Sequence, residues 1–278
     1  MTPVTYRNDL FSPSPLKGPV ATDIYRPSAH NAQAVILAAG SGRRLTGGDS
    51  EAPPKALLEF EGQTLLHRHI RNLEQCGIAH ITVVVGYHAD QVRAAARSGA
   101  VSAVVDTREN VDFREGSILS LLAARSALCA GHPILLMDAD VLCDSRLLAA
   151  LVQGEPGSRL LVDRVFEAGD EPVKLCVAGD RIVDFHKRPR NAFDWCGESV
   201  GFFWLEGETA AAIARRAEAI AGDGGRRLEY EDAIREVMLD PTQARFGFRD
   251  ITGLPWIEID FPEDVVRARE FVLPALAQ

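Results

Sequence analysis

The sequence predicts an α/β fold, a Rossmann-like three-layer α/β/α arrangement around a predominantly parallel mixed sheet in a single domain. First, apolar runs without polar alternation occur at 34–37, 81–85 and 133–137, as in strands that are buried on both faces. Second, segments with apolar residues at helical spacing separate these runs. Third, such alternation of strands and helices is typical of a doubly wound parallel sheet.

The remaining elements follow from the same periodicities. Ala178-Gly179-Asp180 is a hairpin signal between two short strands of the second half. Pro262 suits the first turn of a closing helix. The expected helices lie at 63–75, 88–97, 116–130, 208–221, 230–238 and 262–271, and the further strands at 101–105, 159–164, 173–177, 181–186, 199–205 and 256–259.

Residues 1–32 are expected to form an extended N-terminal arm before the domain at 33–278. They carry five prolines and little apolar periodicity: Pro3, Pro13, Pro15, Pro19 and Pro27. Such an arm packs on the core or on a second subunit, so a homodimer is compatible with the sequence.

Composition excludes several classes of partner. The formal net charge of -9 over 278 residues argues against general binding of nucleic acid or of an anionic membrane. The five cysteines form no CxxC or metal-binding pattern and are expected to be reduced thiols of a cytoplasmic protein. No apolar run reaches membrane-spanning length. Any anion site must therefore be a local cluster of Arg and Lys.

A glycine-rich stretch follows the first predicted strand. Gly40 and Gly42 allow backbone N–H groups to approach an anion, and Arg43, Arg44 and Lys55 supply cations that suit a polyphosphate. Leu45 stands where the dinucleotide fingerprint needs a third glycine, and no P-loop string occurs. An ordinary glycine turn with solvated arginines is the plain alternative.

The string LAAGSGRRL followed by PPKALLEFEGQTLLHRHIRNL resembles the signature of the sugar-phosphate nucleotidyltransferase superfamily. The resemblance implies that Arg44 and Lys55 are catalytic. It also implies a nucleotide-binding part at about 33–145 and an acceptor-binding part at about 146–278. The nucleotide-binding residues of the glycine-rich loop would be Leu37, Ala38, Ala39, Gly40, Ser41, Gly42 and Arg43.

Acidic residues follow a later buried strand, at Asp138 and Asp140. Ligands of open parallel sheets bind at the carboxyl ends of the strands, where a carboxylate can hold Mg²⁺ against phosphate oxygens. The family resemblance selects Asp140, and the segment WIEIDFPED adds Asp260 as the second metal ligand. Asp138 would assist the metal or only orient the loop. Solvated loop acids are the alternative for the first pair, and a carboxylate at a helix N-terminus is the alternative for Asp260.

Thr107-Arg108-Glu109-Asn110 is followed by Gly116-Ser117-Ile118-Leu119-Ser120-Leu121. These two segments resemble small cytidylyltransferases of the phosphocholine, inositol-1-phosphate and phosphonate type. The resemblance implies that Lys187 contacts the acceptor phosphate or the α-phosphate, although an exposed basic loop is the plain alternative. Asn110 and Ser117 would contact the base or the ribose, and both residue types also cap helices. The implied acceptor-binding residues are Lys174, Glu198, Tyr230, Glu231 and Trp256.

Two features bear on the acceptor and point in different directions. Tyr230, Trp195 and Trp256 would form an aromatic wall for a cationic head group, but Tyr230 also lies on an apolar helix stripe that suits core packing. Arg188 and Arg190 favour an anionic acceptor such as a phosphonate.

The sequence therefore predicts a Mg²⁺-dependent cytidylyltransferase. It would transfer CMP from CTP to a small phosphorylated or phosphonate acceptor and release pyrophosphate. The alternatives are a uridylyl- or guanylyltransferase that acts on a sugar phosphate, and a nucleotide-binding module without catalytic activity.

Overall fold

A computed structural model describes residues 31–153, 156–167 and 169–276. The expected N-terminal arm lies outside the described residues except for its last two positions. Among the described helices, none combines the length and the apolar character that crossing a membrane requires. The cysteines in this part of the chain form no disulfide bond with one another.

A nine-stranded mixed sheet forms the centre of the fold. Its first-half strands run parallel in the order β6-β1-β4-β5, while β11 pairs antiparallel with β6, β8 and β9, and β12 joins the edge of β8. The predicted α/β fold with a mixed sheet is confirmed. The strands are β1 (Gln33–Ala38), β4 (His80–Val85), β5 (Val104–Glu109), β6 (Ile134–Asp138), β8 (Arg159–Asp163), β9 (Lys174–Ala178), β10 (Arg181–His186), β11 (Trp195–Leu205) and β12 (Gly247–Asp250).

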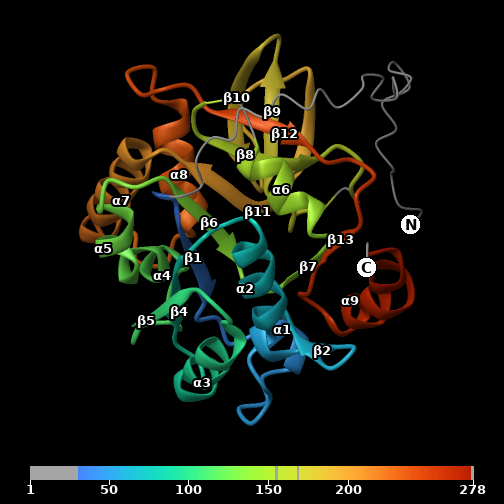
Figure 1. The fold of residues 1–278 in the computed structure, drawn as a ribbon. Coiled ribbons are helices and arrows are strands. Elements are labelled where there is room, and N and C mark those ends of the chain that lie inside the picture. Colours follow the sequence, from blue (N-terminus) through green and yellow to red (C-terminus); the bar gives the residue numbers. More distant parts are fainter. Residues whose placement is uncertain (1–30, 154–155, 168, 277–278) are drawn as a thin grey trace.

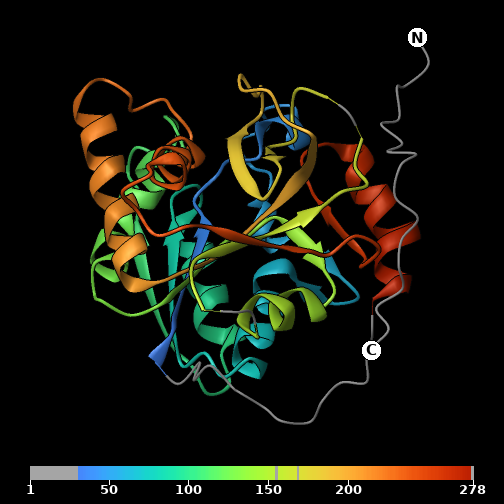
Figure 2. The same ribbon diagram turned by 90° about the horizontal axis from the view of Figure 1, so that it is seen from above.

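Helices cover both faces of this sheet, and one apolar core lies on each face. Figure 2 shows α6 in yellow-green on one side of the sheet and α7 in orange on the other. Each of these helices contributes buried apolar side chains to one of the two cores, which is the physical reason for the three layers. The first face carries α2 (Leu65–Gln75), α3 (Ala89–Gly99) and α6 (Arg146–Val152), and the second carries α4 (Ile118–Ala123), α5 (Arg125–Leu128), α7 (Gly207–Gly222) and α8 (Tyr230–Leu239).

The C-terminal segment packs against the beginning of the domain. In Figure 1, α9 (Pro262–Arg267) in red lies beside the blue segment of α1 (Arg43–Thr46) and β2 (Glu59–Phe60). A small third core joins them through residues from across the chain: Phe60, Leu65, Leu142, Ile259 and Ala268. The C-terminal segment therefore packs against Leu45 and Phe60, which follow the glycine-rich loop in the chain. A short strand β3 (Gln63–Thr64), 3₁₀ turns at Lys55–Leu57 and Leu273–Ala275, and a π turn at Ala268–Val272 complete these segments.

Two sequence predictions need correction. The strand expected at 101–105 is wrong in position, because β5 runs over Val104–Glu109. Glu74 accepts hydrogen bonds from the backbone N–H groups of Val101, Ser102 and Ala103, which holds that stretch as a turn. β5 is an edge strand with exposed polar positions, so hydrophobicity did not mark it.

The helix expected at 116–130 is also wrong as one element, since it is divided at Ala124 into α4 and α5. The sequence reading missed α6, β12 and a short strand β7 (Val141–Cys143), and it began β11 four residues late.

Candidate active site

In the loop after β1, one position requires glycine both for its backbone conformation and for the space beside Lys55. Gly42 has φ +59°, and a Cβ there would lie 2.9 Å from Cγ of Lys55. A side chain at this position would strain the backbone and would also collide with the aliphatic part of Lys55. At Gly40 a Cβ would meet no atom within 4 Å, so the turn is open there, and Arg43 is exposed beside it.

The two acidic segments lie side by side although more than 100 residues separate them. β7 pairs antiparallel with β13 (Trp256–Glu258), and Val141 faces Glu258 in this ladder. The backbone N–H of Ile259 donates to the carbonyl of Asp140 at 2.9 Å. This backbone pairing brings the predicted metal ligands Asp140 and Asp260 together.

Lys55 lies between the two aspartates. Its Nζ is 2.9 Å from Oδ2 of Asp140 and 2.5 Å from Oδ1 of Asp260. Desolvation opposes the charge on this lysine, but the carboxylates of Asp140 and Asp260 outweigh it and raise the pKa of Lys55. The ammonium group is therefore fully ionised at physiological pH.

Arg44 extends the same charge network toward Lys187. Its guanidinium lies 2.9 Å from Asp260 and also pairs with Glu171, and Glu171 lies 3.7 Å from Nζ of Lys187. The pairs thus run without a break from Asp140 through Lys55, Asp260, Arg44 and Glu171 to Lys187. The structure brings all five predicted catalytic and metal-binding residues into one network. Glu171, which joins its halves, carried no signal in the sequence.

Two carboxylates of this network and a third beside it suit a divalent cation. Oxygen atoms of Asp140, Glu258 and Asp260 lie within 4.8 Å of one another. Such hard oxygen donors are the ligands that Mg²⁺ prefers. Desolvation in the site, followed by the charges of Asp140, Asp260 and Asp138, raises the pKa of Glu258 well above its usual range. A bound cation would relieve this crowding, so the residues present fit the metal. Glu258 was missed, although its spacing of two from Asp260 places both on one face of an extended chain.

Asp138 points to a different partner. The hydroxyl of Tyr230 donates to its Oδ2 at 2.7 Å, and Gly201 leaves the space that this oxygen occupies, since a Cβ there would lie 2.2 Å from it. Desolvation, with Asp140 and Glu231 nearby, raises the pKa of Asp138 well above its usual range. Gly201 has φ +77° and marks the point where β11 changes its partner from β9 to β6. Sequence reasoning missed this glycine.

The ammonium group of Lys174 is hydrogen-bonded within the protein. Its Nζ donates to three carbonyls, those of Gly169, Pro172 and Lys187, at 2.8, 3.1 and 2.8 Å. These bonds hold the backbone of Lys187 and the chain that carries Glu171. Lys174 is thus a candidate for positioning Lys187, and contact with an acceptor stays a prediction.

The other predicted acceptor residues have separate surroundings. Burial raises the pKa of Glu198 to about 7, with Asp163 adding to the effect. Nε1 of Trp256 donates to Asp163 at 2.9 Å, and Trp195 packs on the guanidinium of Arg164. In the described part of the chain no ring contact joins any two of the three aromatic residues Tyr230, Trp195 and Trp256.

Asn110 and Ser117 also use their polar groups internally. Asn110 is buried and donates to Ser120 at 3.0 Å. The hydroxyl of Ser117 donates to Glu229 at 2.5 Å and accepts from the backbone N–H of Tyr230 at 2.9 Å, which ties α4 to α8. Their role toward a nucleotide stays a prediction.

A cleft of about 360 Å³ opens beside Lys187. Glu231 from α8 lines it, and Oε2 of this residue is buried without a hydrogen-bond partner among the described residues. The charge network and the cleft share Glu171 and Lys187. The residues that line it are Asp170, Glu171, Val173, His186, Lys187, Arg188, Glu229, Glu231 and Asp232.

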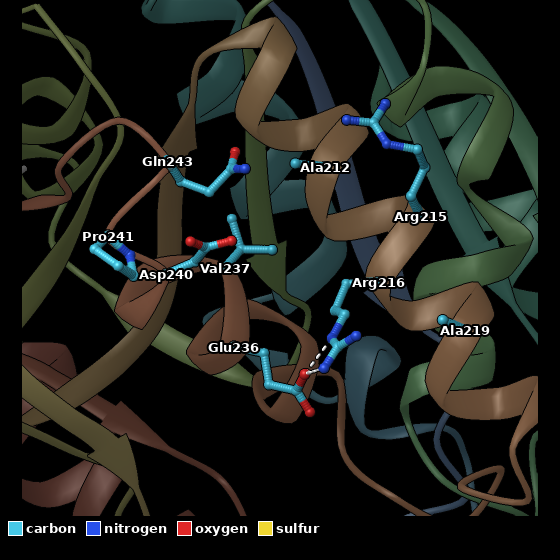
Figure 3. A pocket seen from close by; sticks show the side chains of 9 residues that line it. All are labelled: Ala212, Arg215, Arg216, Ala219, Glu236, Val237, Asp240, Pro241 and Gln243. Carbon is cyan, nitrogen blue, oxygen red and sulfur yellow. Dashed lines mark hydrogen bonds and ion pairs between the residues drawn. The ribbon is translucent and has the colours of Figure 1, made fainter.

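A larger hollow of about 560 Å³ lies elsewhere, between α7 and α8 (Figure 3). An ion pair between Arg216 and Glu236 crosses it. It shares no residue with the charge network, so size alone does not locate the active site. Its lining residues are Ala212, Arg215, Arg216, Ala219, Glu236, Val237, Asp240, Pro241 and Gln243.

Comparison with known proteins gives related enzymes over most of the chain. The chain is 30% identical over 242 residues to a bifunctional IPC transferase and DIPP synthase of Rubrobacter xylanophilus. This match covers 86% of the chain and 52% of the relative. The chain is 25% identical to a CMP-5'-(3-aminopropyl)phosphonate synthase of Streptomyces rubellomurinus, over 86% of the chain and 38% of the relative. The chain thus spans about half the length, or less, of these curated relatives.

Solved structures share the fold. The inositol-1-phosphate CTP transferase from T. maritima superposes with a TM-score of 0.69 at 19% identity, covering 90% of this chain and 99% of that chain. The CTP:phosphocholine cytidylyltransferase of Streptococcus pneumoniae gives a TM-score of 0.67 at 20% identity, with coverage of 86% and 98%. At such identities the likeness establishes the fold alone.

Residues 34–187 match the MobA-like NTP transferase domain, which is more than half of the chain. The match contains the glycine-rich loop, Lys55, Asp140 and Lys187, which the structure joins in one network of ion pairs. On the combined evidence of profile, relatives and fold, the chain belongs to the MobA-like NTP transferase family.

Proposed function

We propose that the protein is a cytidylyltransferase that transfers CMP from CTP to a small phosphorylated or phosphonate acceptor and releases pyrophosphate. The observation that carries the proposal is the unbroken ion-pair network from Asp140 to Lys187. Arg44 and Lys187 pair with Glu171 from two sides, so Arg44 with Lys55 would serve the triphosphate and Lys187 would serve the acceptor. The names of the relatives and structural neighbours support cytidine as the base and a phosphorylated or phosphonate acceptor.

In this reaction an acceptor oxygen attacks the α-phosphorus, and the bond from that phosphorus to pyrophosphate breaks. The attacking oxygen is already ionised, so no general base is needed and the main barrier is repulsion between two anions. Arg44 and Lys55 would stabilise the charge that develops on pyrophosphate, and Lys187 would offset the charge of the acceptor. Residues 33–145 would hold the nucleotide and residues 146–278 the acceptor.

Asp140, Glu258 and Asp260 would hold Mg²⁺, which would supply further positive charge next to the phosphates. Lys55 now contacts two of these carboxylates. With the metal bound, Asp140 and Asp260 would be shared between the cation and the ammonium group of Lys55, which would contact a phosphate oxygen.

The test is pyrophosphate release from each of the four NTPs with Mg²⁺ and a panel of phosphorylated and phosphonate acceptors. We expect release with CTP, and Lys55→Met should lower kcat/KM by about 10²–10³-fold. Arg216→Ala removes an ion pair in the hollow between α7 and α8. It is the matched control and should leave the rate unchanged. Preference for UTP or GTP with a sugar phosphate would overturn the assignment of the base. Nucleotide binding without release in any pair would overturn the enzymatic function.

A further inference from the structure

Two cysteines lie directly opposite each other in the central sheet. Cys176 of β9 and Cys196 of β11 are partners in the antiparallel ladder between these strands. In the same register, the backbone N–H of Ser199 donates to the carbonyl of Val173 at 2.8 Å. Hydrogen-bonded and non-hydrogen-bonded pairs alternate along such a ladder, and Cys196 lies three positions from Ser199. The two cysteines therefore form a non-hydrogen-bonded pair, in which the opposite Cα atoms approach to about 4.5 Å.

Both cysteine side chains lie on the same face of the sheet. Leu175 and Val177, which flank Cys176, belong to one apolar core, and Trp195, which precedes Cys196, packs against that core. Because side chains alternate along a strand, the two thiols face the opposite way. No disulfide joins them in the structure. A disulfide needs a Cα separation of about 4.4–6.8 Å, so the backbone spacing of this pair already suits one.

The two sulfur atoms differ in exposure and in proton affinity. Cys176 is fully buried, whereas Cys196 is partly exposed. A hydrogen bond with the Cys176 thiol lowers the pKa of Cys196, burial opposes this effect, and the ammonium group of Lys174 adds to it. The same hydrogen bond, together with burial, raises the pKa of Cys176. The thiolate is the nucleophilic form of cysteine, so Cys196 is the sulfur suited to attack and Cys176 is the one that keeps its proton.

The position of Lys174 in the ladder agrees with its effect on Cys196. Lys174 lies two positions from Cys176 and is paired with Glu198, which lies two positions from Cys196, so all four side chains share one face. Its ammonium group is held by three backbone carbonyls. Burial raises the pKa of Glu198 to about 7, which limits the negative charge that this carboxyl adds beside the thiols. A cation next to a thiol favours the thiolate.

We propose that Cys176 and Cys196 form a modification site at which hydrogen peroxide produces a reversible disulfide, with Cys196 as the attacking sulfur. The Cys196 thiolate attacks one oxygen of the peroxide, the O–O bond breaks, and the departing hydroxide takes up a proton, which leaves a sulfenic acid on Cys196. Sγ of Cys176 then attacks the sulfenic sulfur and loses its proton, the S–O bond breaks, and water leaves. Two thiols and one peroxide thus give one disulfide and two waters, and two electrons pass from sulfur to oxygen.

This chemistry uses no substrate of the proposed transferase, so it stands or fails independently of that function. Peptide mapping by mass spectrometry tests it on the full chain, because trypsin places the two cysteines on separate peptides, 175–181 and 191–215. Protein that has been reduced and freed of reductant is treated with a small excess of hydrogen peroxide. The remaining thiols are then blocked, and the protein is digested without reduction.

We expect the treated chain to lose two of its five thiols, the two peptides to be joined by a disulfide, and dithiothreitol to separate them again. Five remaining thiols would overturn the proposal. A disulfide from either cysteine to a different cysteine, or oxidation of the exposed Cys129 to the same extent, would also overturn it. The wild-type protein gives this answer without any substitution.

Variants then assign the two roles. Dimedone, which traps sulfenic acids, should label Cys196 in the Cys176→Ser protein and should leave Cys176 unlabelled in the Cys196→Ser protein. Cys129→Ser is the matched control and should form the wild-type disulfide. Circular dichroism verifies the fold of each variant. Labelling of Cys176 in place of Cys196 would overturn the assignment of the attacking sulfur, and absence of label in both variants would overturn the route through a sulfenic acid.

Discussion

Replacement of Gly201 by alanine should destabilise the protein by more than its backbone conformation alone explains. At φ +77° an alanine costs about 1–2 kcal/mol relative to glycine. The new Cβ would also lie 2.2 Å from Oδ2 and 3.1 Å from Cγ of Asp138. Asp138 must then turn away from the Tyr230 hydroxyl, which loses a 2.7 Å hydrogen bond and leaves a buried group unpaired, at a cost of about 1–3 kcal/mol.

Urea unfolding measures this cost as the free energy of unfolding. We expect Gly201→Ala to lose about 2–5 kcal/mol in total, and Gly131→Ala to lose only the strain of about 1–2 kcal/mol. Gly131 is the matched control because it has φ +83° and open space around a Cβ. In an Asp138→Ala background the clash is gone, so Gly201→Ala should then cost no more than the control. An equal cost of Gly201→Ala in both backgrounds would refute the reasoning.

Three further predictions concern charge. Glu198→Gln should stabilise the protein above pH 7 and not below about pH 4.5. Its carboxyl has a folded pKa of about 7 against an ordinary 4.5, so the wild type loses stability as pH rises through this window, by at most about 3 kcal/mol; a pH-independent difference between the two unfolding curves would contradict this. Lys55→Met should cost about 3–5 kcal/mol in metal-free buffer, since the largely enclosed Asp140 loses its ion pair and Asp260 keeps only the one with Arg44. Added Mg²⁺ should raise its melting temperature more than that of the wild type, and an equal rise would argue against the metal site at Asp260. Lys174→Met should raise KM for the acceptor about tenfold with a smaller change in kcat, because the backbone of Lys187 loses its 2.8 Å contact; steady-state kinetics with an unchanged KM would exclude the positioning role.

The sequence could predict the central part of the fold because the relevant forces are local or periodic. Buried parallel strands have no polar alternation, and each helix facing the sheet repeats its apolar residues at helical spacing, so β1, β4, β6 and α2 were visible in the residues themselves. Edge strands and connecting elements could not be predicted in this way. β5 and β12 are largely polar, and their positions depend on the neighbouring strands with which they pair.

The same distinction holds for the site. The glycine-rich loop with Arg44 and Lys55, and the acids Asp140 and Asp260, were readable from motifs that each lie within a few adjacent residues. Only the tertiary structure decided that these motifs form one ion-pair network, because the antiparallel pairing of β7 with β13 and the link through Glu171 join segments far apart in the chain. The unpaired oxygen of Glu231 and the space that Gly201 leaves for Asp138 were likewise beyond sequence reasoning. Both are properties of what surrounds a side chain, and that is determined by packing of the whole domain.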